Sequence, residues 1–317
     1  MTPSAARHPA LKRLCSAFAA AIVLSFPVPT LQAQAKTPAP RPKIVETCAA
    51  HAAPKAFAEK LPALHEMFQK VAGLPLTGKP VTDVLRNPAH GFQSCFMSAF
   101  PDTRQGDFIA NKIRVLKSET NGQAYIHEMF HGAQQANGSG DMPGTETMRM
   151  EDSIEGNMLI EATAVGYSFA AYKEMSKTDP QAYEDFANSG YAFGMKEYFE
   201  KAYGEAFEKL TALAPALREK KALEAGGKAV VKALLEGRDS YWTSTYANYA
   251  IENAPTYGGL SVERNDPAYA RTRRDLYLKA GAISPGFNLT PDDLLGPRAV
   301  RAIDGYLKAQ GIEFTYK

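Results

Sequence analysis

Apolar residues recur at helical spacing along most of the 317-residue chain, and the pattern changes between Gly91 and Lys117. There, short aromatic and β-branched runs are separated by Pro101, Gly106 and Asn111, which predicts two or three short strands. The fold class is therefore expected to be α+β and predominantly α-helical. We expect a small antiparallel sheet next to the helix that carries the candidate site, and a helical C-terminal region.

Helices are expected on both sides of this region. An amphipathic helix is predicted from Phe57 to Val71, because apolar residues fall on one face and Gly73 ends the pattern. From Asp179 onward the chain is expected to be nearly all helical, with breaks at prolines and at Gly226-Gly227. Two aromatic stripes in this part, which we interpret as core, contain Phe199, Tyr203 and Phe207, and Trp242, Tyr246 and Tyr249.

One predicted helix carries His127-Glu128-Met129-Phe130-His131, an H-E-x-x-H pattern. Residues four apart lie on one face of a helix, so both imidazoles can bind the same metal ion. Zinc lowers the pKa of a bound water towards about 7, and Glu128 lies on the turn between the two histidines, where its carboxylate can take the proton. The pattern predicts one Zn²⁺ ion and a hydrolytic water. The alternative is a pair of buried, hydrogen-bonded core histidines.

A similar run, His65-Glu66-Met67-Phe68-Gln69, ends in glutamine instead of histidine. Without a second imidazole this run cannot chelate a metal ion. We therefore interpret His65 as an ordinary helix residue.

A long helix is predicted from Met148 to Met175, and it supplies the third candidate ligand. Glu161 falls in the middle of its apolar stripe, with the small residues Ala164 and Ser168 on the same face. A carboxylate on an apolar face is costly unless a cation or strong donors lie opposite it. We interpret Glu161 as a metal ligand delivered from a second, closely packed helix. The stripe itself contains Ile154, Met158, Val165 and Tyr172.

Other interpretations of this helix stay open. Glu161 can instead pair with an arginine or lysine inside a helical core. Glu155 and Glu151 are weaker candidates for the third ligand, because they lie nearer the edge of the apolar stripe.

The pattern H-E-x-x-H, followed about thirty residues later by Glu161 on a second helix, resembles the gluzincin class of zinc metallopeptidases. The nearer resemblance is to small bacterial metallopeptidase-like domains, the minimal gluzincins, in which the active helix continues as H-x-x-Q. His131-Gly132-Ala133-Gln134 matches that extension, and the resemblance covers Gly106 to Met175. It implies zinc held by His127, His131 and Glu161, with Glu128 as general base. The glycine and third histidine that metzincins require after this pattern do not follow His131.

The resemblance also implies two features of a peptide site. In gluzincins an edge strand before the active helix pairs with the extended substrate backbone, which here points to the predicted strand Lys112 to Lys117. The alternative is a strand that only covers the core. A hydrogen-bond donor to the developing oxyanion is expected from outside the two metal helices, and the sequence does not choose among Tyr246, Tyr249 and Tyr257.

Residues 1–35 have a basic start, a short apolar run and an A-x-A end, which predicts an export signal cleaved near Ala35. A retained anchor is the alternative. A linker and N-terminal segment is expected at 36–55, and a single metallopeptidase-like domain at 56–317, within which 190–317 is a candidate helical subdomain. The expected location is periplasmic or secreted, in a bacterium. No other stretch has the length and apolarity of a membrane span, so stable membrane insertion after cleavage is not expected.

Charge and cysteine content refine this picture. Removing 1–35 takes away three of the 36 basic residues and none of the 34 acidic ones, which leaves a net charge near −1. No basic run interleaved with aromatics appears, so a nucleic-acid partner is not expected. Cys48 and Cys95 are expected to form a disulfide in an oxidising compartment. A metal-binding thiolate pair is the alternative.

The sequence therefore predicts an exported zinc metallopeptidase that acts on a peptide or protein substrate. Two other classes stay open. One is a non-catalytic periplasmic helical binding or scaffold protein. The other is a zinc hydrolase of a different amide bond, such as one in cell-wall material.

Overall fold

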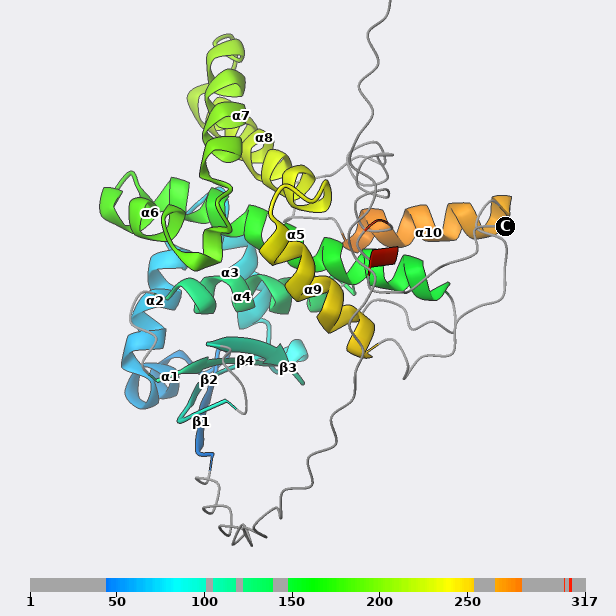
Figure 1. Cartoon of the computed structure of the whole chain (residues 1–317). Helices are drawn as coiled ribbons and strands as arrows, with labels where there is room; N and C mark the ends of the chain where they lie inside the picture. Colours follow the sequence, from blue (N-terminus) through cyan, green and yellow to red (C-terminus); the bar gives the residue numbers. More distant parts are fainter. Residues whose placement is uncertain are drawn as a thin grey trace, which may run out of the picture. The chain divides into compact units, whose positions relative to one another are not determined.

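The computed structural model describes residues 44–100, 105–117, 122–138, 148–253 and 266–280, together with Gly305, Lys308 and Ala309 (Figure 1). From Ile44 onward these residues belong to one compact unit. The expected export signal at 1–35 and the tyrosine candidate Tyr257 lie outside the described residues.

The described part of the chain is mainly helical with one small sheet, and this confirms the expected α+β class. In chain order its strands and helices are β1 (Glu46–Ala50), α1 (Pro54–Lys60), α2 (Pro62–Ala72), α3 (Gly78–Arg86), the 3₁₀ turn η1 (Pro88–His90), β2 (Gln93–Met97), β3 (Gly106–Ile109), β4 (Lys112–Leu116), α4 (Gln123–Ala136), α5 (Met150–Met175), α6 (Pro180–Ala187), the 3₁₀ turn η2 (Gly190–Ala192), α7 (Lys196–Lys209), α8 (Pro215–Leu235), α9 (Ser240–Asn253) and α10 (Pro267–Ala280).

The sheet has the strand order β1-β2-β4-β3 and is mixed. The pairs β1–β2 and β3–β4 are antiparallel, whereas β2–β4 is parallel, so the expectation of a wholly antiparallel sheet was wrong for this pair. The turn Ala110-Asn111 joins β3 to β4 with φ values of 48° and 63°, as a tight hairpin requires. The second strand of this hairpin, rather than the first, lies beside β2. As a result β4 is an interior strand and β3 is an edge strand.

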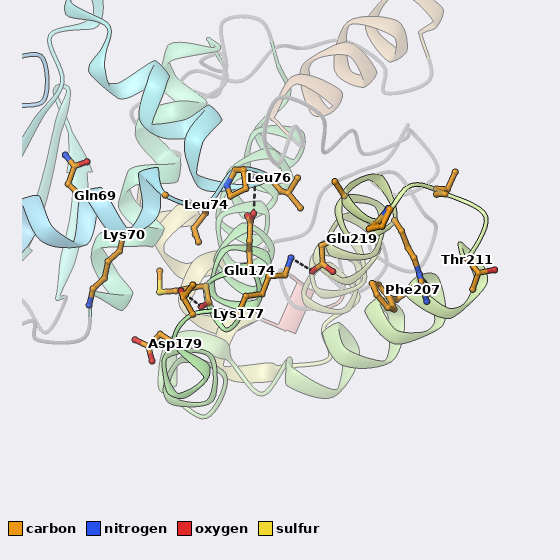
Figure 2. A pocket seen from close by; sticks show the side chains of 18 residues that line it. Gln69, Lys70, Leu74, Leu76, Glu174, Lys177, Asp179, Phe207, Thr211 and Glu219 are labelled. Carbon is orange, nitrogen blue, oxygen red and sulfur yellow. Dashed lines mark hydrogen bonds and ion pairs between the residues drawn. The ribbon is translucent and has the colours of Figure 1, made fainter.

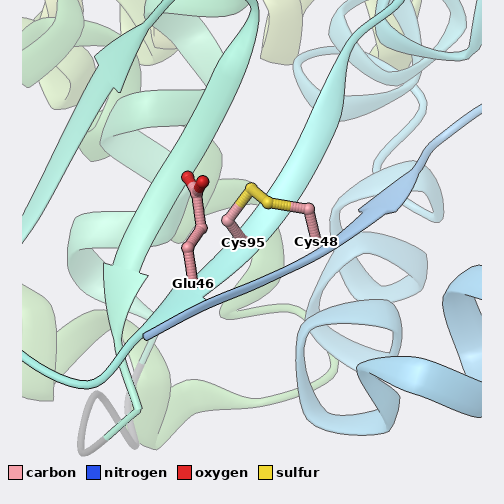
Figure 3. Close-up of side chains that lie close together, drawn as sticks. All are labelled: Glu46, Cys48 and Cys95. Carbon is pink, nitrogen blue, oxygen red and sulfur yellow. A yellow bond between two sulfur atoms is a disulfide. The ribbon is translucent and has the colours of Figure 1, made fainter. Parts of the chain in front are cut away.

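A disulfide ties the N-terminal strand to the sheet. Cys48 and Cys95 are register partners in β1 and β2, and their sulfur atoms are bonded, with Glu46 nearby on the same face (Figure 3). The range 36–55, expected as a linker and N-terminal segment, therefore contains a paired strand from Glu46 onward. The thiolate-pair alternative does not apply, since both sulfurs are used in the disulfide.

Two local expectations about helix breaks were wrong. The predicted helix from Phe57 to Val71 is two helices, because Pro62 cannot continue the preceding helix and instead begins α2. Gly226-Gly227 does not end a helix but lies inside α8. A Cβ atom on Gly166 of α5 would lie 2.8 Å from the carbonyl oxygen of Gly227, so the absence of a side chain on Gly166 allows α5 and α8 to cross at close range.

α5 is the central helix of the described fold. It contacts α4 on the side of the sheet and packs against α6, α8, α9 and α10 elsewhere (Figure 1). The apolar stripe expected on this helix is buried, with Ile154, Met158, Val165 and Tyr172 each no more than 2% exposed. α4 lies between α5 and the sheet, where it contacts β3 and β4. The helices α8, α9 and α10, which follow Gly190, all pack on α5 and therefore share its core.

α10 is held to α5 by buried polar contacts. The Tyr269 hydroxyl donates to Asp152 at 2.5 Å, and an Arg273 nitrogen lies 3.2 Å from the other oxygen of this fully buried carboxylate. The Tyr277 hydroxyl lies 2.8 Å from a carboxylate oxygen of Glu155. The buried carboxylates of Asp152 and Glu155 on α5 therefore accept hydrogen bonds from side chains of α10.

A hollow of about 940 Å³ lies between the ends of α2 and α5 and the turn that joins α7 to α8 (Figure 2). Apolar side chains line much of it, and the acidic ones are engaged within the protein. Glu174 accepts hydrogen bonds from the backbone and hydroxyl of Thr77, and Glu219 lies 3.2 Å from the Lys177 ammonium. None of the candidate site residues lines this hollow. Within the described residues, no helix combines the length and apolarity needed to cross a membrane.

His51 is a buried histidine in the sheet-side core. Its Nε2 lies 2.6 Å from the Ser94 hydroxyl, and its ring packs against the rings of Phe57 and Phe68. Burial, with a smaller contribution from Arg86, lowers the pKa of His51 to about 3, despite an opposing effect of the Leu85 backbone. The folded protein therefore keeps His51 neutral at pH values where the unfolded chain binds a proton.

We predict that His51 weakens the fold in acid. Its folded pKa is depressed, so its contribution is complete above the unfolded pKa of about 6.5 and is lost as the pH falls from there towards 3. The free energy of unfolding should fall by up to about 1.4 kcal/mol per pH unit from this group. Urea unfolding at pH 7, 6, 5 and 4 should show a shallower pH dependence for His51→Phe than for the unmodified protein. Equal slopes would contradict the assignment.

Candidate metal centre

α4 begins after Gly122, whose φ of 68° suits glycine. Its first turn is fixed to the sheet, because the Tyr125 hydroxyl is hydrogen-bonded to the Ser94 hydroxyl at 2.5 Å. Both histidines of the H-E-x-x-H pattern then fall on the face that meets α5. His127 is 6% exposed and His131 is 8% exposed.

His127, His131 and Glu161 converge on one point. The two Nε2 atoms are 3.1 Å apart, and each lies 3.3 Å from Oε2 of Glu161. Neighbouring ligands of a tetrahedral zinc ion, with bonds of about 2.0–2.1 Å, are about 3.3 Å apart. The three donor atoms therefore have the spacing of ligands on one face of such a tetrahedron, and two nitrogens with one carboxylate oxygen suit zinc. The Glu161 side chain is 21% exposed, so the site opens to the surface on this side.

The electrostatics of this group favour a cation among the three side chains. Burial alone raises the pKa of Glu161, but the imidazoles of His131 and His127 outweigh it and hold that pKa well below its usual range. Burial alone lowers the pKa of His131, but the Glu161 carboxylate outweighs it and raises this pKa to about 9. Positive charge is therefore stabilised where the three donor atoms meet.

Glu128 is buried beside this group, next to β3. A Cβ atom on Gly106 of β3 would lie 3.2 Å from the Cγ of Glu128, so the strand and the carboxylate are in close contact. Burial raises the pKa of Glu128, and the carboxylates of Glu161 and Asp107 add to this, against the opposing effect of the two imidazoles. The carboxylate thus holds a proton more readily than an exposed one, which suits a general base.

Gln134 joins the site from the next turn of α4. Its side-chain oxygen lies 2.7 Å from Nδ1 of His131, and its side-chain nitrogen contacts the Ile160 carbonyl and the Thr163 hydroxyl on α5. In the sequence this residue was visible as part of the H-x-x-Q extension. Its contacts could not be predicted, because they depend on how α4 and α5 pack.

The other candidates from the sequence have different positions. Glu155, six residues before Glu161, contacts the Tyr277 hydroxyl on α10 instead of the histidines. The side chains of Glu151 and Tyr249 lie outside the described residues. His65 lies on α2, where its ring contacts the side chain of Gln69. It does not belong to the group formed by His127, His131 and Glu161.

Tyr246 on α9 lies within electrostatic range of the candidate ligand Glu161. Its ring packs against Phe193 and Trp242. Burial raises the pKa of Tyr246 well above its ordinary value, and the carboxylates of Glu161 and Glu128 raise it further. The hydroxyl therefore lies within electrostatic range of both carboxylates and stays protonated. Of the three tyrosines considered from the sequence, this is the one whose side chain the structure describes.

The strand expected to bind substrate is not an edge strand. β4, which spans most of Lys112 to Lys117, pairs with β2 on one side and β3 on the other. The edge next to Glu128 belongs to β3 instead, because the hairpin turn at Ala110-Asn111 places β3 on the outside. β3 is one of the two edge strands of the described sheet, and β1 is the other.

Comparison of the chain with protein-family models, curated proteins and solved structures found no match.

We predict that the purified protein binds one zinc ion through His127, His131 and Glu161. His131→Ala and Glu161→Ala should each weaken zinc binding by more than the 10–100-fold typical of outer-shell changes, because each removes a ligand. Glu155→Gln on the same helix is the matched control and should bind zinc like the unmodified protein. Isothermal titration with zinc after chelator treatment measures these affinities. Equal affinity of Glu161→Ala and the control would exclude Glu161 as a ligand.

Proposed function

We propose that this protein is a zinc-dependent hydrolase that cleaves peptide bonds. The observation that carries the proposal is the convergence of His127, His131 and Glu161, with Glu128 beside them on α4. Two imidazoles and one carboxylate leave a fourth position for water or substrate, as in catalytic zinc sites. The resemblance to minimal gluzincins points to the same chemistry.

The protein's own groups can carry out the proton transfers of hydrolysis. When bound, a zinc ion would activate a water molecule and polarise the scissile carbonyl. Glu128 would accept the proton from that water and later deliver it to the leaving amine. Burial raises the pKa of Glu128, which makes this carboxylate a stronger base than an exposed one.

The edge of β3 favours a peptide substrate over other amides. β3 is an edge strand of the described sheet, and Gly106 brings it against Glu128. An extended peptide can add to such an edge as a further strand, which would place a backbone carbonyl next to the ligand group. A cell-wall amide lacks a continuous peptide backbone of this kind and would use the edge less fully.

Tyr246 is the proposed donor to the oxyanion that forms on the scissile carbonyl. It comes from α9, which is neither of the two metal helices, and its hydroxyl stays protonated near Glu128 and Glu161. A neutral hydroxyl in this position can donate a hydrogen bond where negative charge develops.

We further propose that the enzyme is exported to the periplasm or secreted, with the signal at 1–35 removed. The disulfide between Cys48 and Cys95 supports this location, because structural disulfides persist in oxidising compartments.

Replacing the general base separates metal binding from turnover. Glu128→Gln should keep zinc bound, because Glu128 is not a ligand, and should lower the rate of hydrolysis at least 100-fold. Release of fragments from casein and from a peptide library measures activity, and muropeptides test the cell-wall alternative. Full activity of Glu128→Gln would refute the mechanism. Tightly bound zinc without hydrolysis of any of these substrates by the unmodified protein would favour a binding or scaffold protein.

Tyr246→Phe should lower kcat about 100- to 1,000-fold with little change in KM, because the lost hydrogen bond forms mainly in the transition state. Tyr241→Phe, on the same helix and 70% exposed, is the matched control and should keep full activity. Steady-state kinetics on one fluorogenic peptide gives both constants. An unchanged kcat for Tyr246→Phe would remove Tyr246 from the mechanism.

A further inference from the structure

Gln134 connects the two helices that carry the proposed zinc ligands. It is 1% exposed and contacts His131 on α4 and both Ile160 and Thr163 on α5. We propose that Gln134 is a positioning residue: it fixes which nitrogen of His131 faces the metal, and it holds His131 in register with Glu161. This inference rests on the proposed zinc site.

The orientation of the Gln134 amide is set by α5. The backbone oxygen of Ile160 can only accept hydrogen bonds, and it lies 3.2 Å from the amide nitrogen. The Thr163 hydroxyl donates to the same carbonyl at 2.8 Å, so its oxygen is left to accept from Gln134 at 2.7 Å. Rotating the amide by half a turn would place two acceptor oxygens against each other. The amide oxygen must therefore point away from α5, towards His131.

This orientation decides which nitrogen of His131 keeps a hydrogen when the ring is neutral, as it is when it binds a metal. An amide oxygen only accepts, and it lies 2.7 Å from Nδ1, so Nδ1 carries a hydrogen. Nε2 is then the nitrogen available to a metal, and it is the one that lies 3.1 Å from Nε2 of His127 and 3.3 Å from Oε2 of Glu161. Because the contact is buried, water does not replace Gln134 readily.

The same amide also controls spacing between the helices. Ile160 immediately precedes Glu161 and Thr163 follows it by two residues. One side chain therefore bonds the His131 ring to the backbone turn that carries the Glu161 carboxylate. Outer-shell contacts of this kind typically change metal affinity 10- to 100-fold when removed.

Three substitutions separate the parts of this role. Gln134→Met keeps the length of the side chain but removes both the acceptor and the donor. Gln134→Glu keeps an acceptor for the Nδ1 hydrogen and removes the donor to α5. Thr163→Val keeps the shape of the threonine and removes its hydroxyl. Gln135→Met is the matched control, because Gln135 is the next residue, has the same side chain and is partly exposed.

Two measurements that do not depend on turnover test the proposal. The first is zinc affinity by isothermal titration. The second is the slowly exchanging Nδ1 proton of His131 in ¹⁵N-edited NMR spectra, recorded with and without zinc. Gln134→Met should bind zinc 10- to 100-fold more weakly and lose the Nδ1 resonance, whereas Gln135→Met should match the unmodified protein. Gln134→Glu should retain the resonance, because it keeps the acceptor.

Thr163→Val should weaken zinc binding less than Gln134→Met does. The double variant should bind zinc no more weakly than Gln134→Met alone, because both changes break one shared contact. Circular dichroism establishes that each variant is folded, and Thr163→Val and Gln134→Glu supply the test if Gln134→Met does not fold.

The possible outcomes separate this inference from the proposed function. Equal zinc affinity and an intact Nδ1 resonance in Gln134→Met would overturn the positioning role, whatever the activity of the unmodified protein. Weakened zinc binding and a lost resonance in Gln134→Met would support the role, even if the unmodified protein hydrolyses no substrate. In that case the zinc site stands and the hydrolase proposal fails.

Discussion

The Glu161 carboxylate at the contact between α4 and α5 is the constraint on which the site depends. Burying a carboxylate is costly unless its charge is balanced. Other buried acids of α5 are balanced by neutral or permanently charged donors: Glu174 by the backbone and hydroxyl of Thr77, and Asp152 by α10. Glu161 instead faces two imidazoles, which balance its charge only when a proton or a metal ion lies between them. This is the physical reason to expect a cation here.

The sequence was sufficient to predict most helices and the contact between α4 and α5, which carry the candidate ligands. The long periodic segment that became α5 is almost as long as expected, and its buried stripe was visible residue by residue. The sheet was harder to predict, because the order of short strands depends on pairing between distant segments and on the turn at Ala110-Asn111. The prediction of a break at Gly226-Gly227 was wrong, since a sequence does not show that the Phe199 ring of α7 lies against Gly226 inside α8.

The candidate site shows the same division between local and tertiary information. His127, Glu128 and His131 follow from helical spacing alone, and Glu161 follows from the position of a charge on an apolar face. The contacts of Gln134 could not be derived this way, since Ile160 and Thr163 belong to the other helix. The position of Tyr246 relative to Glu161 likewise depends on the packing of α9 on α5.

The polar contacts between α10 and α5 have a consequence for when the protein can complete its fold. Asp152 and Glu155, at the start of α5, receive donors from Tyr269, Arg273 and Tyr277, which are made more than a hundred residues later. Until those residues have been synthesised, the buried acids of α5 lack these partners. The final packing of α5, which carries Glu161, is thus coupled to synthesis of a distant part of the chain.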